Sequence, residues 1–309
     1  MQHIYPLLLK PAVKDYLWGG NQLKTRFGIE SDYDITAEAW VLSTHKNGPG
    51  TVRNGAFAGK TLEEALAVWG QSAPDILVKL IDARDRLSLQ VHPDDAYAWE
   101  HHQSPGKTEM WYVLDAAPGA ALICGFARSM STEEFAAHIQ NDTTEQAIRS
   151  YPVKPGDVFF IPAGTVHAIG AGILIAEVQQ NSDVTYRVSD WGRVGADGKP
   201  RELHVSRALD VSVTEPYTLP CGQVGEVKDI AGGSLRTLAE CERFAAWECT
   251  LQGKASVPAD IRCLLCIEGE ATLTCDGCED VTIPAGASVY LPEGLQSTIE
   301  GDARVLWIK

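Results

Sequence analysis

Short apolar or alternating segments bounded by Gly, Pro and Asp recur along almost the whole chain. Many short segments of this kind, separated by turn residues, are typical of the strands of a sandwich or barrel. Helical periodicity is rare by comparison. The expected strands occupy residues 76–81, 87–91, 110–114, 121–124, 158–161, 173–178, 261–267, 289–291 and 304–308.

A few segments carry the start signal of a helix. Three Ser or Thr residues are each followed three positions later by Glu or Gln, which is the capping-box pattern. A fourth helix is expected over residues 203–211. We predict that these helices are insertions around a β core. The capping pairs are Thr61 with Glu64, Ser131 with Glu134, and Thr143 with Gln146.

The chain length of 309 residues suggests about two domains. A stretch rich in Pro, Gly and Thr near residues 214–234 shows neither helical nor strand periodicity, and it predicts the boundary between them. We therefore expect a catalytic domain over residues 1–215. A second domain, without metal ligands, is expected over residues 235–309.

An internal echo supports two similar β units. GDVFFIPAGTVH begins at Gly156 and GASVYLPEGLQS begins at Gly286. In each copy a glycine precedes an apolar strand, which ends in Pro, any residue, Gly. The third residue past the second glycine is His167 in the first copy and Ser297 in the second. Only the first unit is thus expected to keep a side chain that can carry out chemistry.

The charge balance excludes some classes of partner. With 26 basic and 41 acidic side chains the formal net charge is −15. This argues against nucleic acid or an anionic membrane, because clustered Lys and Arg bind phosphate backbones. No apolar run approaches the roughly 18 to 20 residues of a membrane span. Seven of the 8 cysteines follow residue 220, which is unlike a secreted disulfide framework. A cytoplasmic protein with reduced thiols is expected.

Four residues have the types and spacing of a metal site. Gln90 and His92 are two apart in an expected strand, so they project to the same face. Glu109 opens the next apolar strand after a loop with Pro and Gly. With His167 they would form a site of two nitrogens and two oxygens and a single anionic ligand, which suits Zn²⁺.

Each of these signals has an alternative interpretation. The segment ending at His167 resembles the second sequence motif of the cupin superfamily, but alone it is also compatible with a hairpin and a hydrogen-bonded core histidine. Cupins usually carry His, one residue, His at the earlier position, so Gln90 is a departure.

Two CxxC pairs superficially resemble a second zinc site. Cys263 and Cys266 lie in an expected strand, where residues three apart project to opposite faces. Cys275 and Cys278 flank an Asp-Gly turn, which explains their proximity as a hairpin. We therefore expect one zinc ion per chain.

Four motifs together resemble the type I mannose-6-phosphate isomerases (phosphomannose isomerases) in their short bacterial form. In order they are QVHPDD, GKTEMW, PAGTVHAIG and EVQQNSDVTYRVSDWGR, within residues 87–193. The resemblance implies zinc at Gln90, His92, Glu109 and His167. It also implies an active-site arginine at Arg187 and a lysine at Lys107. The expected fold is mainly β, with two cupin (jelly-roll) β-barrels and a few helical insertions.

The chemistry of this family makes three demands on a site. Moving a proton between C2 and C1 of a sugar phosphate through an enediolate requires a Lewis acid, a proton carrier and a grip on the phosphate. Zinc would supply the first. Lys107 or a zinc-bound water is the expected proton carrier and Arg187 the group that holds the phosphate or the enediolate, although the two cations could exchange roles. Ser88, with Lys107 and Arg187, is expected to bind the substrate.

The sequence therefore predicts a zinc-dependent isomerase that interconverts D-mannose 6-phosphate and D-fructose 6-phosphate. One alternative is a metal cupin oxygenase, which uses two His, a carboxylate and open positions on iron. The Gln90 ligand and the nearby cations argue against it. The other alternative is a non-catalytic sugar-phosphate-binding cupin, which should have lost Lys107, Glu109 or Arg187.

Overall fold

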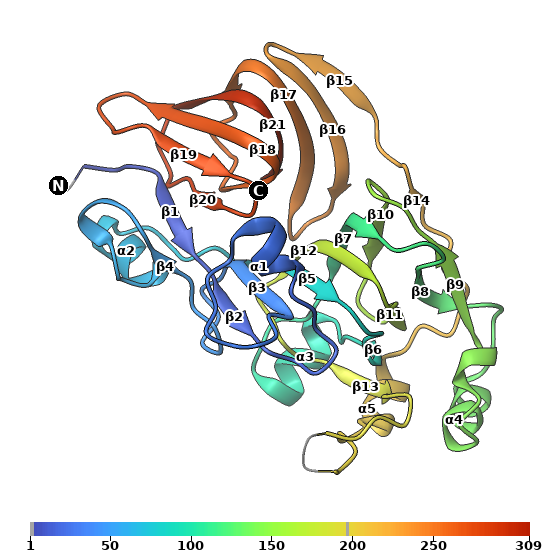
Figure 1. Ribbon diagram of the computed structural model, residues 1–309. Coiled ribbons are helices and arrows are strands. Elements are labelled where there is room, and N and C mark those ends of the chain that lie inside the picture. Colours follow the sequence, from blue (N-terminus) through green and yellow to red (C-terminus); the bar gives the residue numbers. More distant parts are fainter. Residues whose placement is uncertain (1–2, 196–197) are drawn as a thin grey trace. The chain divides into compact units, whose positions relative to one another are not determined.

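The computed structural model describes residues 3–195 and 198–309. Figure 1 shows a mainly β chain with short helices between its strands. The chain forms two compact units. We call Tyr16–Gly20 with Asp82–Gln223 the central unit, and Met1–Asp15, Asn21–Ile81 and Val224–Lys309 the terminal unit. No helix of the described residues is long and apolar enough to cross a membrane.

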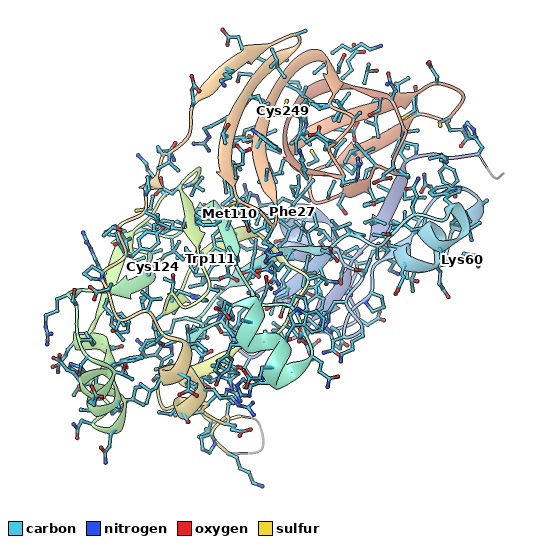
Figure 2. All side chains as sticks on the ribbon, turned by 180° about the vertical axis from the view of Figure 1, so that it is seen from behind. Phe27, Lys60, Met110, Trp111, Cys124 and Cys249 are labelled. Carbon is cyan, nitrogen blue, oxygen red and sulfur yellow. The ribbon has the colours of Figure 1, made fainter. Side chains whose placement is uncertain are left out.

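The central unit contains two antiparallel strand arrays. The first has the strand order β13-β6-β11-β8-β9, and the second has the order β14-β10-β7-β12. The first array comprises β6 (Leu89–Val91), β8 (Ala121–Phe126), β9 (Ile148–Pro152), β11 (His167–Ile169) and β13 (Tyr186–Ser189). The second comprises β7 (Glu109–Ala116), β10 (Val158–Ile161), β12 (Ile173–Gln180) and β14 (Cys221–Gly222). Trp111 on β7 and Cys124 on β8, both labelled in Figure 2, are fully buried side chains of this unit.

The helices of the central unit follow the sequence signals in most cases. α4 begins after Ser131, whose side chain accepts a hydrogen bond from the Glu134 backbone. The Thr143 pair opens only a single 3₁₀ turn, and the helix expected over 203–211 starts two residues later. The helical segments are α3 (Asp95–His102), α4 (Thr132–Gln140), η2 (Thr144–Gln146) and α5 (Val205–Val211).

The terminal unit joins the two ends of the chain through a sheet. Leu7 on β1 pairs with Tyr290 on β20, and the strand order is β15-β16-β17-β21-β18-β20-β1-β4, with β19 beside β18. The strands are β1 (Leu7–Lys10), β4 (Thr51–Val52), β15 (Val227–Ile230), β16 (Gly233–Glu240), β17 (Ala245–Val257), β18 (Cys263–Cys275), β19 (Val281–Pro284), β20 (Ser288–Tyr290) and β21 (Ser297–Ile308). Apolar side chains between these strands form its core, including Cys249 (Figure 2).

The remaining elements of the terminal unit come from the first part of the chain. β3 lies between β5 and β2 and pairs with both in antiparallel fashion. α2 begins at a complete capping box, because Thr61 and Glu64 each accept a hydrogen bond from the other's backbone, as the sequence predicts. The elements are β2 (Ala12–Lys14), α1 (Gln22–Phe27), β3 (Glu38–Leu42), η1 (Gly55–Phe57), α2 (Leu62–Trp69) and β5 (Ile76–Ala83), whose last two residues belong to the central unit.

The two copies of the internal echo share the same backbone conformation at their glycines. Gly156 and Gly164 have φ values of 86° and 85°, and Gly286 and Gly294 have values of 88° and 82°. This left-handed region is costly for residues with a side chain, so each glycine permits the turn before or after its strand. The third residue past the second glycine then opens β11 in one copy and β21 in the other.

The expected fold class is confirmed with one correction. The chain is mainly β with few helices, but the strand orders among the described residues are open paths and do not close into the expected barrels. In each sheet the two outermost strands do not pair with each other, so each sheet keeps two free edges among the described residues. The assignment of a catalytic role to residues 1–215 and of a metal-free cupin-like role to residues 235–309 stays a prediction.

Candidate metal centre and active site

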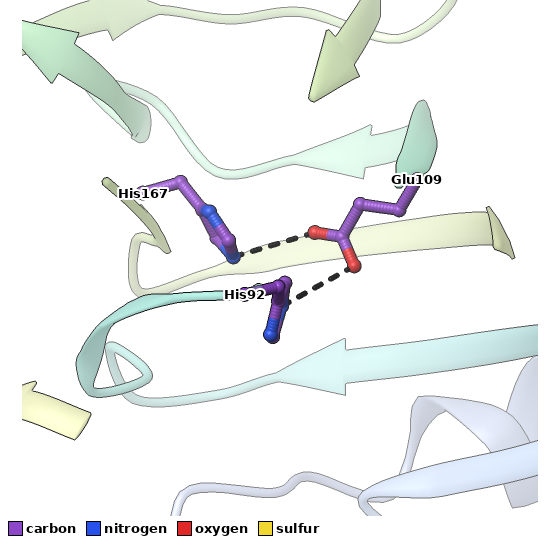
Figure 3. A group of neighbouring side chains, drawn as sticks. All are labelled: His92, Glu109 and His167. Carbon is purple, nitrogen blue, oxygen red and sulfur yellow. Dashed lines mark ion pairs between the residues drawn. The ribbon is translucent and has the colours of Figure 1, made fainter. Parts of the chain in front are cut away.

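Three buried side chains of the central unit converge at one point (Figure 3). His92 follows β6, whereas Glu109 and His167 are the first residues of β7 and β11. Their candidate ligand atoms all lie within 4.8 Å of one another. Glu109 Oε2 is 3.6 Å from His92 Nε2, and Glu109 Oε1 is 3.4 Å from His167 Nε2. This group is the one found among residues 3–195 and 198–309, and it contains no cysteine.

Strand register explains why these residues meet. Gln90 on β6 lies opposite His167 on β11 and opposite Arg187 on β13. On its other side His167 lies opposite Cys124 on β8. Directly opposed residues of antiparallel strands project to the same face. Arg187, Gln90, His167 and Cys124 therefore form one row across the sheet, and the alternation of β6 brings His92 to the same face as Gln90.

Both histidines are oriented by backbone carbonyls. His167 Nδ1 lies 2.8 Å from the carbonyl oxygen of Thr165, and His92 Nδ1 lies 2.9 Å from that of Val184. A carbonyl only accepts, so the hydrogen-bond network places the proton on Nδ1 and leaves the Nε2 lone pair facing Glu109. Burial, reinforced by the positive charge of Lys107, lowers the pKa of His167 to about 4. The ring is therefore neutral, as a metal ligand must be.

Lys107 brings a positive charge into the cluster. Its side chain is buried, and Nζ contacts Glu109 Oε2 and lies 3.2 Å from His92 Nε2. Nζ is also 3.6 Å from Glu177 Oε1, while Trp111 Nε1 donates to Glu177 Oε2 at 2.8 Å. Glu177 is a residue of the site that the sequence motifs did not predict. The available signal was its place at the start of the EVQQNSD motif, but its proximity to Lys107 depends on the pairing of β12 with β7.

Gln90 reaches the edge of the cluster. Its amide Nε2 lies 3.3 Å from His167 Nε2. An ion would take the amide oxygen, which exchanges places with the nitrogen when the amide group turns over. Ser88, two residues before Gln90, is also buried, and no hydrogen bond among the described residues joins its hydroxyl to the cluster.

Arg187, at one end of the row that it forms with Gln90, His167 and Cys124, is half-buried. Its Nη1 donates to the carbonyl oxygen of Glu202 at 2.7 Å. Its Nε is buried and, within the described residues, has no hydrogen-bond partner. A buried donor without a partner is costly, so this atom is available to an oxygen of a bound ligand.

The donor set fits a divalent transition-metal ion. Two neutral imidazoles, one carboxylate and an amide at the edge are ligand types that such ions accept. The site is deeply buried, since His92, Glu109 and His167 are each at most 1% exposed. The charge of Lys107 balances that of Glu109 in this arrangement.

A mainly β fold with a buried His, Glu and His cluster defines a cupin-type protein with a candidate metal site. The family model "Phosphomannose isomerase type I, catalytic domain" matches residues 7–115. Mannose-6-phosphate isomerase ManA of Bacillus subtilis is 38% identical over 316 residues, which cover 97% of this chain and 98% of that protein. Mannose-6-phosphate isomerase of Streptococcus mutans is 35% identical over 311 residues and 97% of both chains.

A solved structure agrees with these relatives. The crystal structure of mannose 6-phosphate isomerase from Bacillus subtilis matches 98% of this chain and 99% of its own, with a TM-score of 0.90 at 33% identity. The chain therefore belongs to the type I phosphomannose isomerase family. This confirms the family and the enzyme class that the sequence motifs predict.

Proposed function

We propose that this protein is a zinc-dependent enzyme that interconverts D-mannose 6-phosphate and D-fructose 6-phosphate through an enediolate. The observation that carries the proposal is the buried convergence of His92, Glu109 and His167 in a chain of this family. Gln90, His92, Glu109 and His167 would hold one zinc ion per chain. With one anionic ligand the ion keeps positive charge, and when bound it supplies a Lewis acid for the oxyanion that develops during isomerisation.

Lys107 is the proposed proton carrier. Its side chain is buried within reach of the ligand cluster, and buried lysines are suited to exchange a proton with a substrate. The neighbouring Glu177 and Trp111 would hold the lysine side chain in place through the contacts described above. In this role Lys107 acts as the neutral amine: it takes the proton from C2 of the aldose and returns it to C1, while the proton of the C2 hydroxyl moves to O1.

Arg187 and Ser88 are the proposed contacts for the phosphate end or the enediolate. Arg187 belongs to the row that contains Gln90 and His167, and its buried Nε lacks a partner among the described residues. A guanidinium holds phosphate or paired oxygens through two parallel hydrogen bonds. Ser88 directly precedes β6, and if the alternation of that strand continues it would lie on the side of Gln90.

The ligand types alone leave a rival open. Two His and one carboxylate are also the ligands of iron-dependent oxygenases. Relatives aligned over nearly the whole chain are named isomerases, and Lys107 stands within the cluster. Both observations favour the isomerase.

Running the reaction in heavy water tests the enediolate route. A base that has taken the C2 proton exchanges it with solvent during some turnovers, so we expect deuterium at C1 of the fructose 6-phosphate formed from mannose 6-phosphate. Nuclear magnetic resonance of the product measures the label. Partial incorporation agrees with a shielded base. Fructose 6-phosphate without any label, at low conversion and after long incubation, would rule out this route and favour a hydride shift.

A further inference from the structure

The segment Arg201 to His204 holds Arg187 at three points. The His204 backbone N–H donates to the Arg187 carbonyl oxygen at 2.8 Å. In return the Arg187 backbone N–H donates to His204 Nδ1 at 3.1 Å. The Arg187 guanidinium donates through Nη1 to the Glu202 carbonyl oxygen at 2.7 Å. The main chain and the side chain of Arg187 are thus fixed by the same short segment.

This segment is itself anchored at its first residue. Arg201 Nε donates to Asp190 Oδ2 at 2.7 Å, and its Nη2 donates to Oδ1 at 2.5 Å. Arg193 donates to the same Oδ1 at 2.6 Å. Burial of Asp190 opposes its charge, but the hydrogen bonds from Arg201 and Arg193 outweigh burial and lower its pKa. A charged, bidentate pair of this kind fixes the start of the segment.

The imidazole of His204 accepts a hydrogen bond from Arg187 and does not cap the helix that follows, α5. His204 occupies the N-cap position of α5 but makes no side-chain hydrogen bond to that helix. Histidine is not among the residues that helices favour at this position. To accept from the Arg187 N–H, Nδ1 must keep its lone pair, which requires a neutral ring. Burial, and then the charge of Arg187, lower the pKa of His204, in agreement with a neutral ring.

We infer that His204 is a positioning residue that acts through Arg187. The inference rests on the proposed function, because it assumes that Arg187 binds the substrate. A guanidinium that is held before the substrate arrives loses less conformational freedom on binding. The contacts leave the buried Nε of Arg187 unpartnered among the described residues, so the fixed side chain still has a donor for a substrate oxygen.

The test is a double-mutant cycle with His204→Leu and Arg187→Ala. Leucine has a similar size but cannot accept, so we expect His204→Leu to lower kcat/KM about tenfold, as the loss of one buried hydrogen bond does. In the Arg187→Ala background the same change should lower kcat/KM by less than about twofold, since the coupled partner is gone. His204→Asn keeps an acceptor oxygen near the position of Nδ1 and should retain most of the activity. Metal content should be equal in all variants.

A second readout needs no turnover. We expect hydrogen exchange at the Arg187 amide to be about tenfold faster in His204→Leu than in the parent protein, because the amide loses its acceptor. An undiminished effect of His204→Leu in the Arg187→Ala background would overturn the inference, as would unchanged exchange at that amide. Absence of isomerase activity in the parent protein would instead count against the proposed function, and the exchange measurement would still decide the role of His204.

Discussion

Replacing His167 with alanine is expected to remove both the metal and the activity. The ring is fully buried, faces Glu109 and stands at the centre of the proposed ligand set. Without this ring the ion has fewer ligands and should be lost. A Lewis acid stabilises the transition state of such reactions by several kcal/mol, so kcat/KM should fall about 1000-fold or more. Mass spectrometry of the metal and a coupled assay for fructose 6-phosphate measure both consequences.

His101→Ala is the matched control for that experiment. His101 is exposed on α3 and stands outside the ligand cluster, so its variant should keep the parent's metal content and activity. The thermal midpoint of the His167 variant shows whether its fold survives. A folded His167→Ala protein with its metal and normal turnover would mean that the cluster is not the catalytic site.

Arg187→Ala is expected to separate substrate binding from metal binding. Arg187 donates to Glu202 and is not one of the proposed ligands, so the metal should remain. Loss of one charged contact to the substrate or transition state should lower kcat/KM by about 2 to 4 kcal/mol in free-energy terms. Steady-state kinetics with mannose 6-phosphate provide the measurement.

Arg84→Ala is the matched control for Arg187→Ala, because it also removes one arginine charge. The Arg84 side chain is 57% exposed and pairs with Asp85 at the surface, where such pairs contribute little. Its variant should therefore match the parent. If Arg187→Ala shows equally normal kinetics, Arg187 has no part in substrate recognition and the inference about His204 loses its basis.

The convergence of His92, Glu109 and His167 could be predicted because local rules govern most of it. Alternation along one strand places Gln90 and His92 on one face, and the left-handed glycine turn leads directly into His167. The chemistry of the residue types then selects Glu109 as the anionic partner. The structure brings His92, Glu109 and His167 together, as these rules imply.

The surroundings of the cluster could not be predicted in this way. Glu177 reaches Lys107 only because β12 pairs with β7 in one particular register, and the sequence pattern does not show that register. The same holds for His204, because residues 201–204 lie in no helix or strand. Irregular segments lack the periodicity from which contacts can be inferred.

The long-range organisation was equally beyond local patterns. Leu7 near the start of the chain pairs with Tyr290 near its end. Such a pairing is set by the packing of a common core, in which Val289 of the same strand is fully buried. The alternating segments predict that strands exist, but not which strands become neighbours. For this reason the sequence predicted closed barrels where the structure has open sheets.

Whether the buried cluster holds a catalytic zinc ion is tested by determining metal content and isomerase activity on the same preparation, before and after chelation. If Gln90, His92, Glu109 and His167 hold a catalytic zinc ion, the protein should contain about one zinc per chain and convert mannose 6-phosphate to fructose 6-phosphate. Activity should disappear with the metal and return when zinc is restored. Full activity in protein from which all metal has been removed would contradict a catalytic role for the metal.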